Sequence, residues 1–353
     1  MARPFDPNSV APPGAGIFGL PDSRDDAHIV IHGVPFDATQ SYGVGAANAP
    51  EAIRQASLQV DLFDRQFGRI YEQGICLLPV SKELARLSKS TRKLAAPLIR
   101  KAGADPRDNK PVKQINAACE KVAEITYTTA WSILAQGKVP GLIGGDHSTS
   151  MGQIRACAEY VQRLQGGMRV SPRDAGLGIL QLDAHMDLRP SFQGFKYSHA
   201  SIMHNVLAEV PAVTKLVQVG VRDFGEIEFD AARSHRGRVT THFDQDWAEA
   251  LADGANLSRL IGEALKPLPS SVYVTFDIDA LEPSHCPSTG TPVPGGLSFA
   301  QAAMLLMALR DSGRTVVGFD LVEVCPCGRS PDWDAAVGAR VLYKLCGAAA
   351  ARQ

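Results

Sequence analysis

The sequence predicts an α/β fold built on a mainly parallel, doubly wound β-sheet. Three observations support this prediction. Short apolar runs rich in β-branched residues recur along the chain, segments with helical spacing of apolar residues separate them, and no period of about 20 to 50 residues repeats. A length of 353 residues allows one large α/β domain or two smaller ones. Because no stretch resembles an interdomain linker, we expect a single domain over residues 1–353.

The predicted elements begin after a polar, Pro-rich arm at about residues 1–27. The strands are short and almost entirely apolar, as expected of parallel strands covered by helices on both faces. They are expected at 29–34, 141–143, 177–182, 216–221, 272–276 and 316–319. The helices carry apolar residues every three or four positions. They are expected at 115–135, 151–164, 255–265, 299–309 and 333–345.

Residues 65–113 are expected to form an insertion, and its second part is strongly basic. Segment 82–113 holds ten Lys or Arg residues and three acidic ones, so its local charge is 10 − 3 = +7. Interleaved leucines predict a partly amphipathic helix, and Pro106 and Pro111 predict a loop beyond it. We expect a solvated helical insertion or a subunit contact. Few aromatic residues accompany the charges, which disfavours nucleic-acid binding.

The overall composition excludes several classes of function. The chain has 36 Lys and Arg residues against 37 Asp and Glu residues, a net charge of −1 that gives no general attraction to nucleic acid or to anionic membranes. No apolar run approaches the roughly 20 residues that a membrane-spanning helix requires. The N-terminus lacks the apolar stretch of a secretory signal, and seven scattered cysteines suit a reducing compartment. We therefore expect a cytoplasmic protein. Cys325 and Cys327 are too close for an easy disulfide.

Candidate functional residues follow four of the predicted strands. Ligands of open α/β sheets bind beyond the carboxyl ends of the strands. His147 follows the strand at 141–143, Asp183-Ala-His185-Met-Asp187 follows 177–182, Asp277-Ile-Asp279 follows 272–276, and Glu323 follows 316–319. In an extended chain a spacing of two places alternate side chains on one side, so several groups should converge from each strand.

The convergence of four carboxylates and two imidazoles predicts a site for two divalent metal ions. The candidate ligands are His147, Asp183, His185, Asp187, Asp277 and Asp279. About four negative charges in one concave site cannot all remain ionised without cations. One such cluster is often only a cap or a turn, but three clusters at successive strand ends favour a metal centre. Asp and His ligands without thiols suit Mn²⁺, Ni²⁺, Co²⁺ or Zn²⁺, and two ions about 3.5–4 Å apart would share a hydroxide.

Across about 300 residues the chain resembles the ureohydrolase family, which includes arginase, agmatinase and guanidinobutyrase. The matching motifs are Gly-Val-Pro-Phe-Asp at 33–37, Pro-Glu-Ala-Ile-Arg at 50–54, Gly-Gly-Asp-His-Ser at 144–148, Asp-Ala-His-Met-Asp at 183–187, Thr-Phe-Asp-Ile-Asp at 275–279, Thr-Gly-Thr-Pro-Val-Pro-Gly-Gly-Leu at 289–297 and Asp-Leu-Val-Glu-Val at 320–324. The resemblance implies a three-layer α/β/α fold, a binuclear metal centre and a homotrimer or homohexamer.

The resemblance also implies a role for each ligand. His147 and Asp187 would complete one metal site and His185 and Asp279 the other, while Asp183 and Asp277 would bridge the two ions. A hydroxide shared by two cations has a pKa near neutrality and would attack the planar guanidinium carbon. Asp279 would pass the proton of this hydroxide to the leaving amine, so that urea and an amine or ammonia are released.

Three further residues are considered for contacts with the substrate. Glu323 would hold the guanidinium through paired charge-assisted hydrogen bonds, or it is a core carboxylate that caps a neighbour. His199 aligns with a family histidine that lies near the substrate and would shuttle protons; the family histidine is usually followed by Gly, but here Ala200 and Ser201 follow. His204 has no assigned counterpart, and we expect it either to pack in the core or an interface or to contact substrate.

The loop 188–197 does not resemble the loop with which arginase binds the amino-acid end of its substrate. Phe192, Phe195 and Tyr197 either wall a small, partly apolar pocket or pack against a neighbouring subunit. Arg189 either binds a substrate carboxylate or pairs with a nearby Asp.

The insertion 65–113 and the segment 199–203 look similar to the branch with nickel-dependent guanidine hydrolases and metformin hydrolases. This similarity implies a small guanidino substrate, which would be guanidine, an N-substituted guanidine or a biguanide, with Ni²⁺ or Mn²⁺ as cofactor. It also leaves open a related partner subunit or a nickel metallochaperone. Three alternatives remain: an agmatinase or guanidinobutyrase, a formiminoglutamase-type hydrolase suggested by Asp187-Leu-Arg189, and a non-catalytic subunit of a hetero-oligomer. The filled ligand positions argue against the last of these.

Overall fold

A computed structural model describes residues 5–12, 14–235, 237–327 and 331–350. Within these residues the chain forms a parallel sheet of eight strands, ordered β2-β1-β3-β8-β7-β4-β5-β6. The strands are β1 Ile29–Gly33, β2 Ile75–Leu77, β3 Val139–Ile143, β4 Leu177–Leu182, β5 Val213–Val221, β6 Val239–Phe243, β7 Ser271–Asp277 and β8 Thr315–Val322. The central strands are buried on both faces, as parallel strands require.

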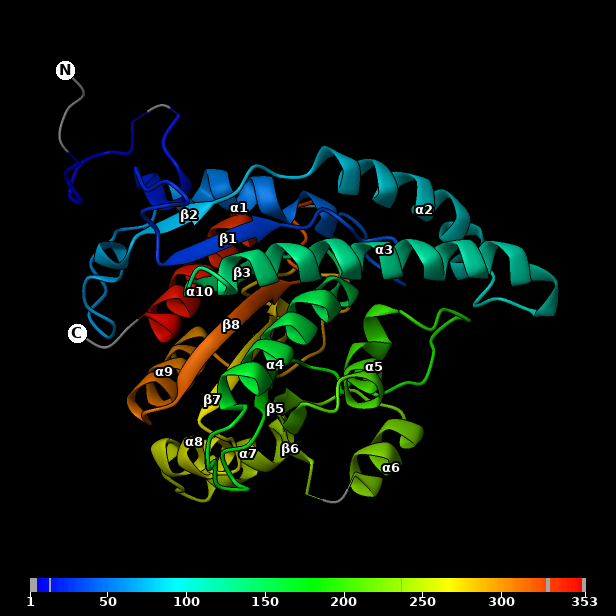
Figure 1. Ribbon diagram of the computed structural model, residues 1–353. Coiled ribbons are helices and arrows are strands. Elements are labelled where there is room, and N and C mark those ends of the chain that lie inside the picture. Colours follow the sequence, from blue (N-terminus) through cyan, green and yellow to red (C-terminus); the bar gives the residue numbers. More distant parts are fainter. Residues whose placement is uncertain (1–4, 13, 236, 328–330, 351–353) are drawn as a thin grey trace.

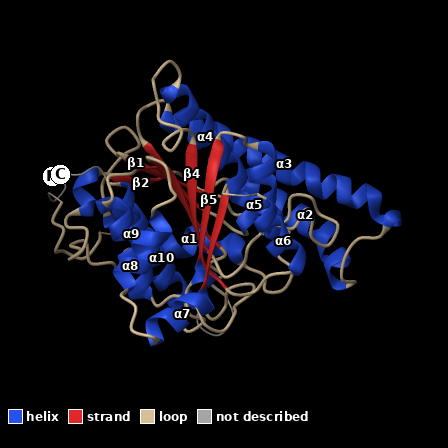
Figure 2. Cartoon of the chain, turned by 90° about the horizontal axis from the view of Figure 1, so that it is seen from below, coloured by secondary structure: helices blue, strands red, loops and turns tan. Residues whose placement is uncertain are grey.

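Helices cover both faces of the sheet and make the three predicted layers (Figures 1 and 2). One layer holds α3 Asn109–Leu134, α4 Met151–Gln165 and α5 Ile202–Glu209. The other holds α1 Ala49–Ser57, α7 Asp244–Ala252, α8 Leu257–Leu265, α9 Phe299–Asp311 and α10 Pro331–Ala349. The remaining helices are α2 Lys82–Arg100, which packs on α3, and α6 Glu226–Ser234, which follows β5. Each layer has its own apolar core against the sheet.

The strand order explains where a site can form. The chain adds strands toward one edge from β1 to β2 and toward the opposite edge from β4 to β6, so the direction of winding changes in the middle of the sheet. Such a change opens a crevice at the carboxyl ends of the strands. Here the neighbours in the middle are β3, β8, β7 and β4, which are the strands that precede the predicted site residues.

The predicted α/β/α class is confirmed, and all the predicted strands and helices are present with shifted ends. The edge strands β2 and β6 and the helices α1, α5, α6 and α7 were not predicted. The strand β2 has only three residues, and the half-buried β6 is Val-Thr-Thr-His-Phe, which lacks a continuous apolar run. Within the arm 1–27, Ile17, Phe18 and Leu20 are buried, and the Phe18 ring packs on Tyr343 of α10.

The basic segment 82–113 forms α2 and the start of α3, and these two helices pack as a long hairpin that extends past the sheet (Figure 1). The amphipathic helix is confirmed, because Leu84 and Leu98 of α2 are buried while most of its basic side chains are exposed. The loop predicted at Pro111 is wrong. The helix α3 begins at Asn109 and holds Pro111 in its first turn, where a missing N–H breaks no helical hydrogen bond. In the described parts of the chain, no helix has the length and apolar character needed to cross a membrane.

Candidate metal centre

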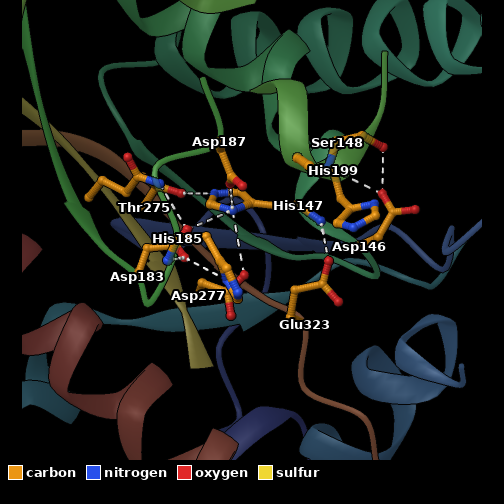
Figure 3. Close-up of polar contacts among 12 residues, drawn as sticks. Asp146, His147, Ser148, Asp183, His185, Asp187, His199, Thr275, Asp277 and Glu323 are labelled. Atoms are coloured by element: carbon orange, nitrogen blue, oxygen red, sulfur yellow. Dashed lines mark hydrogen bonds and ion pairs between the residues drawn. The ribbon is translucent and has the colours of Figure 1, made fainter. Parts of the chain in front are cut away.

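The six predicted metal ligands lie together at the carboxyl ends of β3, β4 and β7. Figure 3 labels all of them except Asp279. Local turns explain how the strand ends present them. The Asp183 Oδ1 atom accepts a hydrogen bond from the backbone N–H of His185 at 2.7 Å, and Asp277 Oδ1 accepts one from that of Asp279 at 2.9 Å. An Asp that bonds the backbone two residues on makes a tight turn. The turn directs both side chains of each pair toward the same cluster.

The first group of side chains surrounds one nitrogen of His147. The His147 Nδ1 atom lies 2.9 Å from Asp187 Oδ2, 3.2 Å from Asp183 Oδ2 and 3.5 Å from Asp277 Oδ2. All four side chains are buried. They come from three different strand ends, so only the folded sheet brings them together.

The second group surrounds His185. Its Nδ1 atom lies 3.1 Å from Asp279 Oδ2 and 3.6 Å from Asp183 Oδ1. Asp183 therefore takes part in both groups, with one carboxylate oxygen toward each histidine. Ligand atoms of His147, Asp183 and Asp187 in the first group, and of His185, Asp183 and Asp279 in the second, lie within 4.8 Å of one another, close enough to bind a single ion. A shared carboxylate is the arrangement expected of a ligand that bridges two ions.

The chemistry of the cluster fits divalent cations. The buried Nδ1 atom of His147 makes no hydrogen bond to any described residue. It faces three carboxylate oxygens, which would repel its lone pair unless a positive charge stood between them. The donors are carboxylate oxygens and imidazole nitrogens with no thiol, a set that suits Mn²⁺, Ni²⁺ and similar ions.

The electrostatics of the cluster show the same need for positive charge. Burial and then the negative charge of Asp183 raise the pKa of Asp187 to about 7, and burial together with Asp279 and Asp183 raises that of Asp277. Burial alone would raise the pKa of Asp183 as well, but its contacts with His147 and His185 hold it below its usual range. Each of these carboxylates requires a nearby cation, either a metal ion or a proton.

Two of the site carboxylates have an uncommon backbone conformation. Asp187 has a φ of 55° and Glu323 a φ of 60°, in the left-handed region that residues with a side chain rarely adopt. A strained residue of this kind costs about 1–3 kcal/mol and persists only where the surrounding structure holds it. At both positions the conformation directs a carboxylate into the site, which ordinary strand geometry would not do.

Glu323 is buried beside the metal ligands. Its Oε1 atom accepts a hydrogen bond from the backbone N–H of His147 at 2.9 Å, and its Oε2 atom accepts one from Gln40 Nε2 at 2.7 Å. Burial and the charge of Asp146 raise its pKa well above the usual range. Each oxygen keeps a second lone pair, so the carboxylate can still receive a cationic ligand from the pocket.

His199 lies at the start of a short 3-10 helix across the pocket from Asp187. Its Nε2 atom is 3.4 Å from Ser41 Oγ, and its Nδ1 atom is 3.3 Å from Ser198 Oγ. Burial and then the electrostatic effect of His185 and His147 lower its pKa to about 3. The ring is therefore neutral near pH 7 and has one nitrogen that donates a proton and one that accepts a proton.

The two metal-ligand groups open into a pocket of about 180 Å³. Glu323 and His199 line its sides. At the outer end the Phe192 ring stands edge-on to His199, with ring centroids 5.9 Å apart, and the Arg189 guanidinium lies 5.0 Å from the centre of the Phe192 ring. Arg189 Nε is held by Glu228 Oε2 at 3.1 Å. Asp223 is the exposed acidic residue among those that line the mouth.

The structure corrects several expectations about the loop 188–197. Phe192 lines the pocket, but Phe195 and Tyr197 do not, because Phe195 is buried against the α2–α3 hairpin of the same chain and the partly buried Tyr197 packs on the same cluster. Arg189 pairs with an acidic residue, as one expectation had it, but that residue is Glu228 and not an Asp. His204 is half-buried in α5 and does not line the pocket.

Sequence reasoning missed the residues that support the site. Thr39 donates to Asp146 and accepts from the backbone N–H of His199, and Gln40 contacts Glu323. Both follow the Gly-Val-Pro-Phe-Asp motif beyond β1. Only the position of β1 next to β3 brings them to the site, although the motif itself was a usable signal.

Comparisons with known proteins agree with the geometry. Residues 27–347 match the family model described as "Arginase family". The chain is 32% identical to an N(1)-aminopropylagmatine ureohydrolase of Thermus thermophilus over 315 residues, which cover 89% of this chain and 88% of that protein. It is 29% identical to an agmatinase of Neisseria meningitidis over 343 residues, covering 96% and 94%. The fold matches the solved structure of proclavaminate amidino hydrolase from Streptomyces clavuligerus with a TM-score of 0.71, 22% identity and coverages of 97% and 99%.

The family match covers most of the chain, including the metal-ligand motifs and the insertion. The resemblance to ureohydrolases expected from the sequence is thus confirmed. The chain belongs to the arginase family, whose members hydrolyse carbon–nitrogen bonds of linear amidines.

Proposed function

We propose that this protein is a binuclear metal-dependent hydrolase of a small guanidino compound, with release of urea and an amine or ammonia. The substrate would be guanidine, an N-substituted guanidine or a biguanide. One observation carries the proposal: a pocket of about 180 Å³ is lined by ligands of both metal-ligand groups and by Glu323. A pocket of this size and charge suits a small planar cation.

His147, Asp183, Asp187 and Asp277 would hold one ion, and His185, Asp183, Asp279 and Asp277 the other. Asp183 reaches both histidines, which supports its bridging role, whereas Asp277 lies 3.5 Å from His147 and is assigned to both ions by analogy with the family pattern. Two divalent cations, when bound, lower the pKa of a water molecule toward neutrality and so supply the nucleophile. The donor set accommodates either Mn²⁺ or Ni²⁺.

The protein side chains orient the substrate and move its protons. Glu323 would accept two N–H groups of the guanidinium through charge-assisted hydrogen bonds, which places the planar carbon above the ligand cluster. Asp279 would take the proton of the attacking water and deliver it to the nitrogen that leaves. The neutral His199 ring lines the same pocket, with Nε2 3.4 Å from Ser41 Oγ, and would shuttle protons to or from the substrate.

The outer wall supports a short substrate. Phe192 limits the pocket beyond His199. The Arg189 guanidinium lies against the Phe192 ring and is itself paired with Glu228. A second candidate is an agmatinase-type activity, because Asp223 at the mouth offers a carboxylate to a terminal ammonium group. The relatives from Thermus and Neisseria are named for agmatine or an agmatine derivative, which supports this second candidate. Asp223→Asn would lower kcat/KM for agmatine and leave that for guanidine unchanged if agmatine is the substrate.

We also propose that the chain forms a homotrimer or homohexamer and works in the cytoplasm. All seven cysteines are free, which supports a reducing compartment.

The decisive experiment measures urea release by protein reconstituted separately with Mn²⁺ and Ni²⁺. The substrates are guanidine, methylguanidine, metformin, agmatine, 4-guanidinobutyrate and arginine, and formamide release from formiminoglutamate is measured alongside. We expect turnover of the small guanidines. Turnover confined to agmatine or guanidinobutyrate would replace the proposal by the second candidate, and formamide release alone would assign the formimino reaction. Activity that requires a second, related chain would identify a partner subunit.

A further inference from the structure

A line of polar side chains crosses the apolar layer between the sheet and α4 and ends at the metal-ligand cluster. Its members are His32 of β1, Gln153 of α4, Tyr273 and Thr275 of β7, Asp320 of β8, and His147. All six side chains are buried. Tyr273 and Thr275 are two apart on one strand, so they share a face of the sheet, and Asp320 is the register partner of Thr275.

Hydrogen bonds join the distant members of this line to Asp320. His32 Nε2 lies 2.7 Å from Gln153 Oε1, Gln153 Nε2 donates to the Tyr273 hydroxyl at 3.0 Å, and that hydroxyl donates to Asp320 Oδ2 at 2.7 Å. The Gln153 amide is held in this orientation, because its Nε2 atom also donates to the backbone oxygen of Phe319 at 2.8 Å. An ideal Cβ at Gly318 would lie 3.2 Å from the Tyr273 ring, so a glycine there leaves room for the ring.

The near members join Asp320 to His147. The Thr275 hydroxyl donates to Asp320 Oδ1 at 2.7 Å, and its oxygen lies 2.8 Å from His147 Nε2. A hydroxyl has one proton, and here a carboxylate receives it. The Thr275 oxygen can therefore only accept a hydrogen bond from His147, whose proton must then sit on Nε2.

The consequence appears on the other side of the His147 ring. With the proton on Nε2, Nδ1 carries a lone pair, and this is the atom that faces Asp183, Asp187 and Asp277. A metal ion needs that lone pair, and an imidazole whose second nitrogen is held by a hydrogen-bond acceptor binds metal in a set orientation. The Asp320 carboxylate is 0% exposed, and burial of an unpaired carboxylate would be costly, so it depends on the hydrogen bonds that Tyr273 and Thr275 donate to it.

We propose that Asp320 is a positioning residue that acts through Thr275 to hold His147 in its metal-binding tautomer and orientation. Tyr273, Gln153 and His32 in turn hold Asp320. The inference rests on the proposed metal centre but is independent of which guanidino compound is hydrolysed. It predicts that Asp320 and Thr275 set the affinity of the ion on the His147 side, while the ion on the His185 side is bound as before.

The test is a titration of chelator-treated protein with Mn²⁺, with free Mn²⁺ followed by electron paramagnetic resonance. We expect two ions per wild-type chain. In Thr275→Val the hydroxyl is lost without a change of volume, and one of the two ions should bind about 10–100-fold more weakly. Thr275→Ser keeps the hydroxyl and should restore the binding of both ions. Asp320→Asn keeps an acceptor without the charge and should give an intermediate loss.

Two further variants separate positioning from a general loss of stability. Tyr343→Phe removes another buried hydroxyl, which donates to the backbone oxygen of Leu62 far from the site, and should leave both affinities unchanged. Tyr273→Phe leaves the Thr275 bond to Asp320 intact and should weaken one ion less than Thr275→Val does. If Thr275→Val and Asp320→Asn both bind two ions as tightly as the wild type, the positioning role is wrong. If the wild type itself fails to bind two ions, the proposed binuclear function is wrong.

Discussion

The two halves of the ligand cluster differ in how firmly the protein holds them. The His147 side chain is 1% exposed, and both ring nitrogens face partners, Thr275 on one side and carboxylates on the other. The His185 side chain is 24% exposed and lines the pocket. The site therefore has a closed half around His147, which is built into the core, and an open half around His185, which is more exposed to the pocket.

Asp183 connects the halves, so its removal should have the largest effect. Asp183→Ala deletes one ligand atom from each group, and we expect it to lower kcat by about a thousandfold or more and to reduce metal content at both sites. Metal analysis and urea release measure this. The matched control is Asp64→Ala, which removes a largely buried carboxylate paired with Lys344 elsewhere. Full activity with two ions in Asp183→Ala would show that the halves do not share this ligand.

Glu323→Gln tests a carboxylate outside the ligand groups. We expect kcat/KM to fall about 100-fold, because the amide cannot form two charge-assisted hydrogen bonds with a guanidinium. The local structure tolerates the change, since Gln40 has a buried Oε1 atom without a partner among the described residues and can turn it toward the new amide. Metal content should stay at two ions. A loss of metal instead of activity would move Glu323 into the ligand set.

Paired substitutions sharpen the comparison of the halves directly. We expect His147→Gln to lower kcat about tenfold more than His185→Gln. The His185 ring is 24% exposed, so water can take its place more readily than that of the His147 ring, which also lines the pocket but is only 1% exposed. Rates and metal stoichiometry of the two proteins, reconstituted in parallel, measure the difference. Equal losses would mean that burial does not distinguish the halves.

The smallest expected effect is a pH dependence of stability in the metal-free protein. Burial and the charge of Asp183 raise the pKa of Asp187 to about 7 from its usual 3.8. Between these values the folded protein holds a proton that the unfolded chain has lost. The stabilisation is therefore present below pH of about 4 and is lost as the pH rises through 7. Calorimetry should show the Tm of chelator-treated wild type falling relative to that of Asp187→Asn over this range, and a relative rise would contradict the shift.

The ligands of both the closed and the open half could be predicted from the sequence, because they lie directly after strands. The pattern Asp183-Ala-His185-Met-Asp187 and its counterpart at 277–279 are local, so their spacing alone indicates convergence. The supporting residues could not be predicted in this way. Tyr273 and Gln153 read as core residues, and Glu228 lies on a helix whose position depends on the edge strand β6, which the sequence pattern did not reveal.

By itself the sequence determined the fold class, the family resemblance and the six candidate ligands, since apolar periodicity and strand-end motifs are properties of neighbouring residues. The tertiary structure decided which strands are neighbours. That order places Gln40 beside Glu323, sends Phe195 into the core while Phe192 stays at the pocket, and joins Asp320 to His147 through Thr275. Such contacts join residues that are far apart along the chain, and no local pattern specifies them, because they arise only when the whole sheet has formed.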